Sequence, residues 1–199
     1  MAQVKRRYRQ SVRSDLAAAT RQRIVEAALE LHSTVGPAKT SLSAIARTAG
    51  ISRPTLYAHF PDEATLFQAC TMHWLGQDPP PDSSAWSTID DPHERLVTAL
   101  TEGYSHYSRN ERMIEKVFRD MYVVDSMRSF NVPLVEGALA QMTQILSSAF
   151  DDAPPLAARR EAMVTVAISF DTWKVLAKRG LSTEDAAGLM ADAVARCVG

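Results

Sequence analysis

Side chains that form hydrogen bonds and stack against planar groups gather in one short segment of the chain, residues 52–59. They are Ser52, Arg53, Thr55, Tyr57 and His59, with Pro54 among them. An arginine guanidinium can donate two parallel hydrogen bonds to a guanine edge, and hydroxyl groups reach phosphates and base edges. The chemistry that this segment favours is noncovalent recognition of a DNA groove.

Two short helices around a glycine turn would present these side chains. The first is expected to follow Thr40 and Ser41, to turn Leu42, Ile45 and Ala46 inward, and to end at Gly50. The second begins at once, because Ser52 can cap it and Pro54 is tolerated in a first turn. Leu56 and Phe60, four residues apart, supply its apolar face. This spacing predicts a helix-turn-helix, and the alternative is an ordinary helical hairpin.

Flanking helices are predicted on both sides of this motif. The pattern of Ile24, Ala27, Ala28, Leu31 and Val35 indicates one helix face, with Thr20 as a possible N-cap and Gly36 as the end. After Pro61 and Asp62, a fourth helix carries Leu66, Phe67 and Cys70 towards Trp74. Residues 20–67 are therefore expected to form one small helical DNA-binding domain.

Charge is distributed unequally along the chain. Residues 1–60 hold ten Lys and Arg against three Asp and Glu, or +7, whereas residues 61–199 hold twelve against twenty, or −8. A basic segment of this kind suits a polyanion such as DNA, and the alternative is a solvated basic face. Residues 1–19 lack apolar periodicity and are predicted to form a flexible basic arm. Its run from Lys5 to Arg13 either reaches a neighbouring minor groove or plays no part in binding.

The segment 40–60 resembles the N-terminal DNA-binding domain of the TetR family. The resemblance covers roughly residues 20–67 and rests on Gly36, Thr40-Ser41-Leu42, Ile45-Ala46, Ala49-Gly50-Ile51-Ser52, Thr55-Leu56-Tyr57 and His59-Phe60. It implies a DNA-binding transcriptional regulator. Since repression is the usual mode in the family, it also implies a repressor that binds a palindromic operator as a dimer.

The resemblance also implies roles for single residues. Thr40 and Ser41 would bind phosphate at the start of the second helix, and Arg53, Pro54 and Thr55 would read bases at the start of the recognition helix. Tyr57 and His59 match positions that contact the sugar-phosphate backbone, and Phe60 matches a core position.

Two residues depart from the family pattern. Glu63 stands where the family often has a lysine that holds a phosphate, and a carboxylate there would repel DNA. Pro54 stands where a small residue is more frequent, and it removes one N–H from possible phosphate contact. Both departures predict weaker phosphate binding at these two positions than in the family pattern.

The remainder, residues 68–199, is expected to form a larger helical domain for dimerisation and ligand binding. Helices are predicted at about 91–108, 110–123, 133–150, 156–179 and 183–197, and Pro79-Pro80-Pro81 marks a loop over 77–87. No strand pattern is present. The predicted fold class is all-α, with about nine helices in total.

The last two predicted helices favour dimerisation. The helix at 156–179 is apolar on two sides, and the helix at 183–197 has a face of small residues that permits close helix packing. TetR relatives dimerise through their last two helices, so the resemblance implies a four-helix bundle between two copies. Two recognition helices would then lie one duplex turn apart, about 34–36 Å.

Aromatic and methionine side chains between the fourth helix and the dimer helices either fill a core or line a pocket for a hydrophobic or aromatic effector. These candidates are Trp74, Tyr104, Tyr107, Met113, Phe118, Met121, Tyr122, Phe130, Met142 and Phe170. The resemblance implies that a small-molecule effector shifts the spacing of the DNA-reading heads and releases the operator. The fourth helix would be the lever.

Other classes of protein are less consistent with the sequence. Cys70 and His73 are too few ligands for a metal site, and His32, His93 and His106 show no ligand spacing or nucleophile motif. We expect no enzyme activity, no metal and no cofactor. No segment predicts a signal peptide or membrane helix, and the cytoplasm is the expected location. A DNA-binding architectural protein without an effector remains the alternative.

Overall fold

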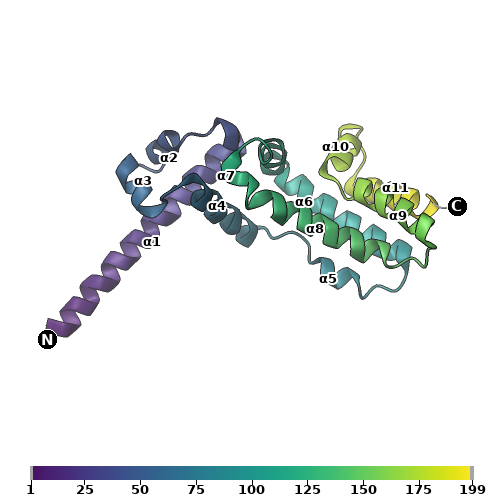
Figure 1. The fold of residues 1–199 in the computed structure, drawn as a ribbon, viewed down its shortest axis with the longest axis horizontal. Coiled ribbons are helices and arrows are strands. Elements are labelled where there is room, and N and C mark those ends of the chain that lie inside the picture. Colours follow the sequence, from purple (N-terminus) through teal and green to yellow (C-terminus); the bar gives the residue numbers. More distant parts are fainter. Residues whose placement is uncertain (1, 198–199) are drawn as a thin grey trace. The chain divides into compact units, whose positions relative to one another are not determined.

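The computed structural model describes residues 2–197, with side chains from residue 11 onward, and every regular element in this part of the chain is helical (Figure 1). The predicted all-α fold class is therefore confirmed. The elements are α1 (Ala2–Thr34), the 3₁₀ helix η1 (Pro37–Lys39), α2 (Leu42–Thr48), α3 (Arg53–His59), α4 (Glu63–Gln77), α5 (Ser83–Trp86), α6 (Pro92–Asp120), α7 (Asp125–Arg128), α8 (Asn131–Ser147), α9 (Pro154–Ala167), α10 (Phe170–Lys178) and α11 (Thr183–Arg196).

Between residues 2 and 197 there are eleven α-helices rather than about nine. Two additions are the four-residue helices α5 and α7. Helix α5 lies inside the segment 77–87 that was expected to be a loop, and it buries Trp86, whose indole N–H donates to Glu102 at 2.8 Å. Single-turn helices leave too little periodicity in a sequence to be recognised.

The chain divides into two compact units. The first contains residues 1–78 and 112–132, and the second contains residues 79–111 and 133–199. Helix α6 contributes its last turns to the first unit. This division therefore differs from the predicted linear domains 20–67 and 68–199, because the segment 112–132 folds with the helix-turn-helix.

The first unit is built around one apolar core beneath the helix-turn-helix. It combines buried residues of α1 to α4: Ile24, Val25, Ala27, Ala28, Ile45, Ala46, Ala49, Leu56, Phe60, Leu66 and Cys70. Ile24, Ala28 and Phe60 are completely buried. Because each fully buried large apolar side chain contributes about 1.5–3 kcal/mol, this core fixes α2 and α3 on α1 and α4.

Helix α1 corrects the prediction for the N-terminal arm. Residues 2–19, expected to be flexible, belong to the continuous helix Ala2–Thr34, and Thr20 lies within it rather than at its start. The hydroxyl of Thr20 donates to the carbonyl of Leu16 at 2.9 Å. Once the buried part of a helix is formed, extension adds one hydrogen bond per residue and needs no apolar face. The alanines at 17–19 favour such extension.

The predicted helices 91–108 and 110–123 are one helix, α6, with its end at Asp120. No break occurs between residues 108 and 110, and the side-chain amide of Asn110 donates to the carbonyl of His106 at 3.1 Å. A hydrogen bond within the helix removes the need for the chain to leave it at this polar residue.

The predicted helix 156–179 is interrupted at Ile168 and Ser169, which separate α9 from α10. The Tyr104 hydroxyl donates to the carbonyl of Ala167 at 2.6 Å, and the Tyr107 hydroxyl donates to that of Ile168 at 2.8 Å. Ser169 then caps α10 by accepting from the N–H of Thr172 at 3.1 Å. The break is stable because side chains take over the backbone hydrogen bonds that a continuous helix would make.

Candidate nucleic-acid interface

Two neighbouring hydroxyl groups lie at the start of α2, and they differ in whether they can still donate a hydrogen bond to DNA. Thr40 uses its hydroxyl proton internally, since it donates to the carbonyl of Gly36 at 2.8 Å. Ser41 is the N-cap of α2, and its oxygen accepts from the N–H of Ala44 at 3.1 Å. An accepting hydroxyl keeps its own proton, so exposed Ser41 can still donate to a phosphate while it caps the helix.

Helix α3 is fixed at both ends of its short length. The predicted cap is confirmed: the Ser52 oxygen accepts from the N–H of Thr55 at 3.3 Å, and the hydroxyls of the two residues lie 2.8 Å apart. The apolar anchor is confirmed too, because Leu56 is 1% exposed and Phe60 is completely buried. This anchor turns the opposite face of α3 towards solvent.

Arg53 and Tyr57 form a pair on the exposed face of α3. The Arg53 guanidinium donates to the Tyr57 hydroxyl at 3.2 Å, and its central carbon lies 5.8 Å from the Tyr57 ring centroid. Tyr57 is 41% exposed. The two residues are one helical turn apart, so the pair orders two long side chains before any ligand arrives. A guanidinium held in this way can donate hydrogen bonds to a base edge or to a phosphate.

The other predicted contact residues of α3 differ in accessibility. Pro54 is exposed in the first turn, where its missing N–H breaks no helical hydrogen bond. Thr55 and His59 are half-buried. The structure thus brings Ser52, Arg53, Pro54 and Tyr57 to one accessible surface, with Thr55 and His59 at its edges.

The start of α4 is acidic. Asp62 caps this helix by accepting from the N–H of Thr65 at 2.7 Å, and this hydrogen bond holds the pKa of Asp62 below its ordinary value. Glu63 is exposed and accepts from the Ser126 hydroxyl at 3.2 Å. Both carboxylates face solvent, so the start of α4 presents negative charge at the surface.

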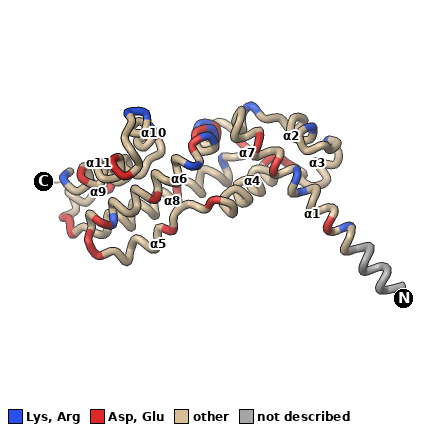
Figure 2. Tube along the Cα trace, turned by 180° about the vertical axis from the view of Figure 1, so that it is seen from behind, with Lys and Arg blue, Asp and Glu red and all other residues tan. Residues whose placement is uncertain are grey.

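Basic residues surround the helix-turn-helix within the part whose side chains are described. Arg21 and Arg23 lie on α1, Lys39 on η1, Arg47 on α2 and Arg53 on α3. Figure 2 shows Lys and Arg positions in blue along these helices. The guanidinium of Arg21 lies over the Phe60 ring at 4.1 Å from its centroid. The side chains of Lys5, Arg6, Arg7 and Arg9, predicted as part of the arm, lie outside the described residues.

Three residues of the first unit that the sequence did not single out as functional meet at the loop before α2. The Asp120 carboxylate accepts from the N–H of Ala38 at 2.9 Å and from the Arg119 guanidinium at 2.6 and 2.8 Å. Gly36, expected only to end a helix, has φ 95° and lies so close to Arg119 and Asp120 that a Cβ would clash with both. The sequence separation of Ala38 and Asp120 leaves no local pattern that could reveal this contact.

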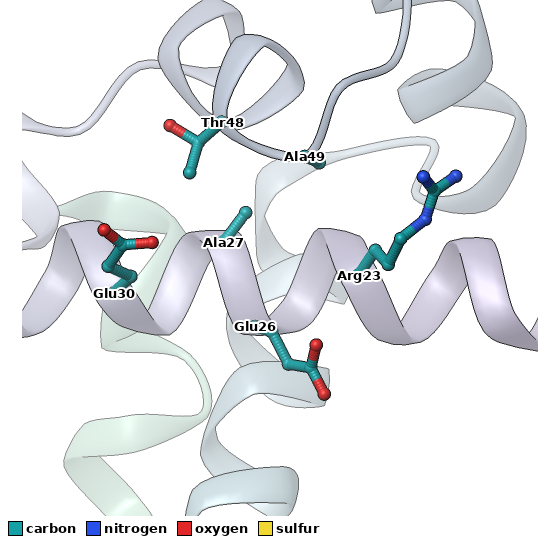
Figure 3. A pocket seen from close by; sticks show the side chains of 6 residues that line it. All are labelled: Arg23, Glu26, Ala27, Glu30, Thr48 and Ala49. Carbon is teal, nitrogen blue, oxygen red and sulfur yellow. The ribbon is translucent and has the colours of Figure 1, made fainter.

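A shallow depression of about 210 Å³ lies between α1 and the end of α2 (Figure 3). Arg23, Glu26, Ala27 and Glu30 line it from α1, and Thr48 and Ala49 line it from α2 and its C-cap. The depression is open to solvent and carries both signs of charge. It therefore offers neither the apolar enclosure nor the single sign of charge that would define a ligand.

The ten predicted effector residues fall into both units. Trp74, Met113, Phe118, Met121, Tyr122 and Phe130 belong to the first unit, and Tyr104, Tyr107, Met142 and Phe170 belong to the second. In the second unit the Tyr107 ring meets Phe170 edge-on at 5.4 Å between centroids, and Trp173, which was not among the candidates, lies 6.0 Å from Tyr107. Burial raises the pKa of Tyr107 to about 12, so its hydroxyl stays protonated as a donor.

Cys70 and His73 have separate environments. Cys70 is buried with its sulfur 4.0 Å from the carbonyl oxygen of Val25, and burial raises the pKa of its thiol to about 12. The His73 ring contacts the side-chain amides of Gln22 and Gln77. In the described part of the chain, no three His, Cys, Asp or Glu side chains are grouped as a metal site. None of its helices is long and apolar enough to span a membrane.

The N-terminal part of the chain is similar to known regulatory proteins. The sequence model of the bacterial regulatory proteins, tetR family, matches residues 24–70. The HTH-type transcriptional regulator AcrR of Shigella flexneri is 48% identical over 48 residues, 24% of this chain and 22% of that protein. SrpR of Pseudomonas putida is 41% identical over 86 residues, 42% of this chain and 38% of that regulator.

The uncharacterized HTH-type regulator TtgW of Pseudomonas putida is also 41% identical over 86 residues, which cover 61% of its length. The chain therefore matches between 22% and 61% of the length of these relatives. All three relatives are named as HTH-type transcriptional regulators.

Solved structures with low sequence identity share the fold over most of the chain. NalD of Pseudomonas aeruginosa, the secondary repressor of the MexAB-OprM multidrug efflux pump, aligns with a TM-score of 0.62 at 19% identity, over 92% of this chain and 98% of its own. A TetR-like regulator of Rhodococcus sp. aligns with a TM-score of 0.61 at 20% identity, over 90% and 95%. The helical fold of both units thus has precedents among solved regulators.

Proposed function

We propose that this chain, which belongs to the TetR family of bacterial regulatory proteins, is a DNA-binding transcriptional regulator that acts in the cytoplasm. The observation that carries the proposal is the exposed face of α3, where Arg53 and Tyr57 are ordered against each other above the buried anchor of Leu56 and Phe60. The recognition helix of a helix-turn-helix enters the major groove with the residues of its start. Ser41 at the start of α2 would donate to the adjacent phosphate.

Selection of DNA tests this function directly. The purified chain is incubated with a library of random duplexes, and bound DNA is recovered over several rounds and sequenced. We expect one enriched motif with two-fold symmetry, because a dimer reads two half-sites. Recovery of duplexes without a shared motif, bound with steep salt dependence, would favour the architectural alternative.

Arg53→Ala is the first variant to test on the selected duplex. Loss of a bidentate base contact reduces discrimination by about 1–3 kcal/mol, so the affinity for the selected duplex should fall about tenfold or more while binding to random DNA changes less. Arg159→Ala is a matched control, because Arg159 is an exposed arginine of the second unit. Equal losses for the selected and random duplexes would assign Arg53 to phosphate instead of bases.

The finer mechanism that we propose is a ligand-responsive repressor. A small hydrophobic or aromatic effector would bind in the C-terminal helical part and favour a spacing of the two reading heads that no longer fits the operator. The aromatic side chains of Tyr107, Phe170 and Trp173 support this preference for the effector class, since they gather within one unit.

Release of a labelled duplex tests the effector step. A panel of uncharged aromatic and aliphatic compounds is added to the complex, and fluorescence anisotropy reports dissociation. An effector should release the selected duplex at saturating concentration and raise the melting temperature of the free protein by mass action. A compound that raises the melting temperature and leaves DNA affinity unchanged would contradict the coupling, though not DNA binding itself.

A further inference from the structure

The loop before α2 is held by a carboxylate from a distant part of the sequence. Asp120 ends α6, is 2% exposed and accepts the N–H of Ala38 at 2.9 Å. Ala38 lies in the middle of η1, which leads through Thr40 to Ser41. We call the Asp120 carboxylate, the Arg119 guanidinium and the N–H of Ala38 the Asp120 anchor.

The surroundings of the Asp120 carboxylate favour its ionised form. Arg119 donates to both oxygens of the carboxylate, and these hydrogen bonds, followed by that from Ala38, hold the pKa of Asp120 below its ordinary value. An ionised carboxylate forms stronger hydrogen bonds to backbone N–H groups than a neutral acceptor does. Lys39 and His32 are the other titratable groups whose charge interacts with that of Asp120.

The backbone at Gly36 packs closely against the side chains of the anchor. Gly36 has φ 95°, a left-handed conformation that favours glycine, and a Cβ at this position would lie 2.8 Å from Asp120 Oδ2 and clash with Arg119. Its carbonyl accepts the Thr40 hydroxyl at 2.8 Å. The segment from Gly36 to Ser41 is thus connected to Asp120 through the N–H of Ala38, and it continues into the cap of α2 at Ser41.

From this geometry we infer that Asp120 is a positioning residue for DNA binding, which holds the loop Pro37–Lys39 so that the Ser41 hydroxyl faces a DNA phosphate. The inference rests on the proposed function. The direction of the change in DNA affinity distinguishes this role from simple electrostatics. Loss of a negative charge alone would raise the affinity of the protein for DNA, whereas loss of the anchor lowers it.

Two variants with the same charge separate these effects. Asp120→Ala removes both acceptor oxygens, and Asp120→Asn keeps one oxygen that can still accept from Ala38. We expect about a tenfold loss of affinity for the selected duplex with Asp120→Ala, the size of one charge-assisted hydrogen bond, and partial rescue with Asp120→Asn. Asp125→Ala is the control, since Asp125 is in the same unit and its side chain is 91% exposed. Its affinity should stay unchanged or rise.

A double-mutant cycle with Ser41→Ala tests the route of the effect. If Asp120 acts through Ser41, the combined variant loses less affinity than the two single losses multiplied together. A structural role without connection to Ser41 would give independent losses. Circular dichroism and melting temperatures confirm that each variant is folded at the assay temperature.

Hydrogen exchange of the Ala38 amide provides a readout without DNA. Asp120→Ala should accelerate this exchange about tenfold or more in the full chain, and Asp125→Ala should leave it unchanged. The inference is overturned if Asp120→Ala binds the selected duplex as well as wild type, or if the Ala38 amide stays protected. If wild type selects no duplex, the proposed function fails, and with it the role of Asp120 in DNA binding, while exchange still reports whether the anchor holds the loop.

Discussion

At the scale of single residues, His32 makes the first unit sensitive to acid. Its ring is 4% exposed, stacks on Phe67 at 5.0 Å between centroids, and has an Nε2 atom without a hydrogen-bond partner. Burial lowers the pKa of His32 from 6.5 to about 4, although the charge of Asp120 opposes this shift. In the unfolded chain the His32 imidazole is therefore protonated below pH 6.5, whereas in the folded chain it is protonated only near pH 4 and below.

The free energy of unfolding should consequently fall as the pH drops through this window. A pKa difference of this size corresponds to roughly 3 kcal/mol. Between pH 7 and pH 4, the free energy of unfolding should fall by roughly 3 kcal/mol less in His32→Leu than in wild type. Urea unfolding at each pH measures this difference. Parallel curves for the two proteins would show that the His32 pKa is not depressed in the folded state.

Residues whose roles are set by near neighbours were predictable from the sequence. Ser52 caps α3, and Leu56 and Phe60 are buried, because caps and helix faces depend on separations of three or four residues. Asp120 was not predictable, since its partner Ala38 is 82 positions away and hydrogen-bonds through its backbone, which carries no sequence signal. The assignment of single residues to DNA contact remains a prediction.

At the scale of elements, the break between α9 and α10 depends on two tyrosines of α6. Tyr104 is completely buried, and removal of its hydroxyl leaves the Ala167 carbonyl without this donor. Tyr104→Phe should lower the free energy of unfolding by about 1–3 kcal/mol, as an unsatisfied buried acceptor does. Ser169→Ala should lower it by about 1 kcal/mol through loss of the α10 cap.

Urea unfolding of both variants checks this prediction, with Ser148→Ala as a control on an exposed serine of the same unit. Tyr104→Phe with wild-type stability would show that this hydrogen bond does not stabilise the folded chain. Sequence periodicity predicted apolar faces for this segment but not its break, because the tyrosines that stabilise the break lie on another helix.

At the scale of the whole molecule, the predicted division at residue 67 differs from the two compact units because long-range contacts join residues 112–132 to the helix-turn-helix. Besides the Asp120 anchor, Asn131 donates to the Thr71 hydroxyl at 2.8 Å. The charge asymmetry separates a basic N-terminal segment from an acidic remainder, yet charge is a property of composition and does not predict which helices fold together. A linear boundary cannot describe a helix such as α6 that contributes to both units.

Dimerisation is the property of the whole molecule that the proposed function requires. Val166 on α9, Val175 on α10 and Leu189 on α11 are each at least 50% exposed, although they are large and apolar. The two helices α9 and α11 also hold each other within one chain, since Arg160 of α9 donates to the carbonyl of Val194 at 2.7 Å. These helices are therefore the ones on which a second copy is expected to pack.

Leu189→Glu tests this expectation, because a carboxylate without a partner is strongly unfavourable in an apolar interface. We expect a folded monomer by analytical ultracentrifugation. Its affinity for the two-fold symmetric duplex should fall by about 10²–10⁴ through loss of bivalent binding, while its affinity for a single half-site stays the same. Val123→Glu is the control, since Val123 is 68% exposed in the first unit and should leave the dimer intact. If Leu189→Glu remains a dimer, the interface lies on another surface. If Leu189→Glu is a monomer whose affinity for the full duplex is undiminished, the chain binds DNA without a second copy.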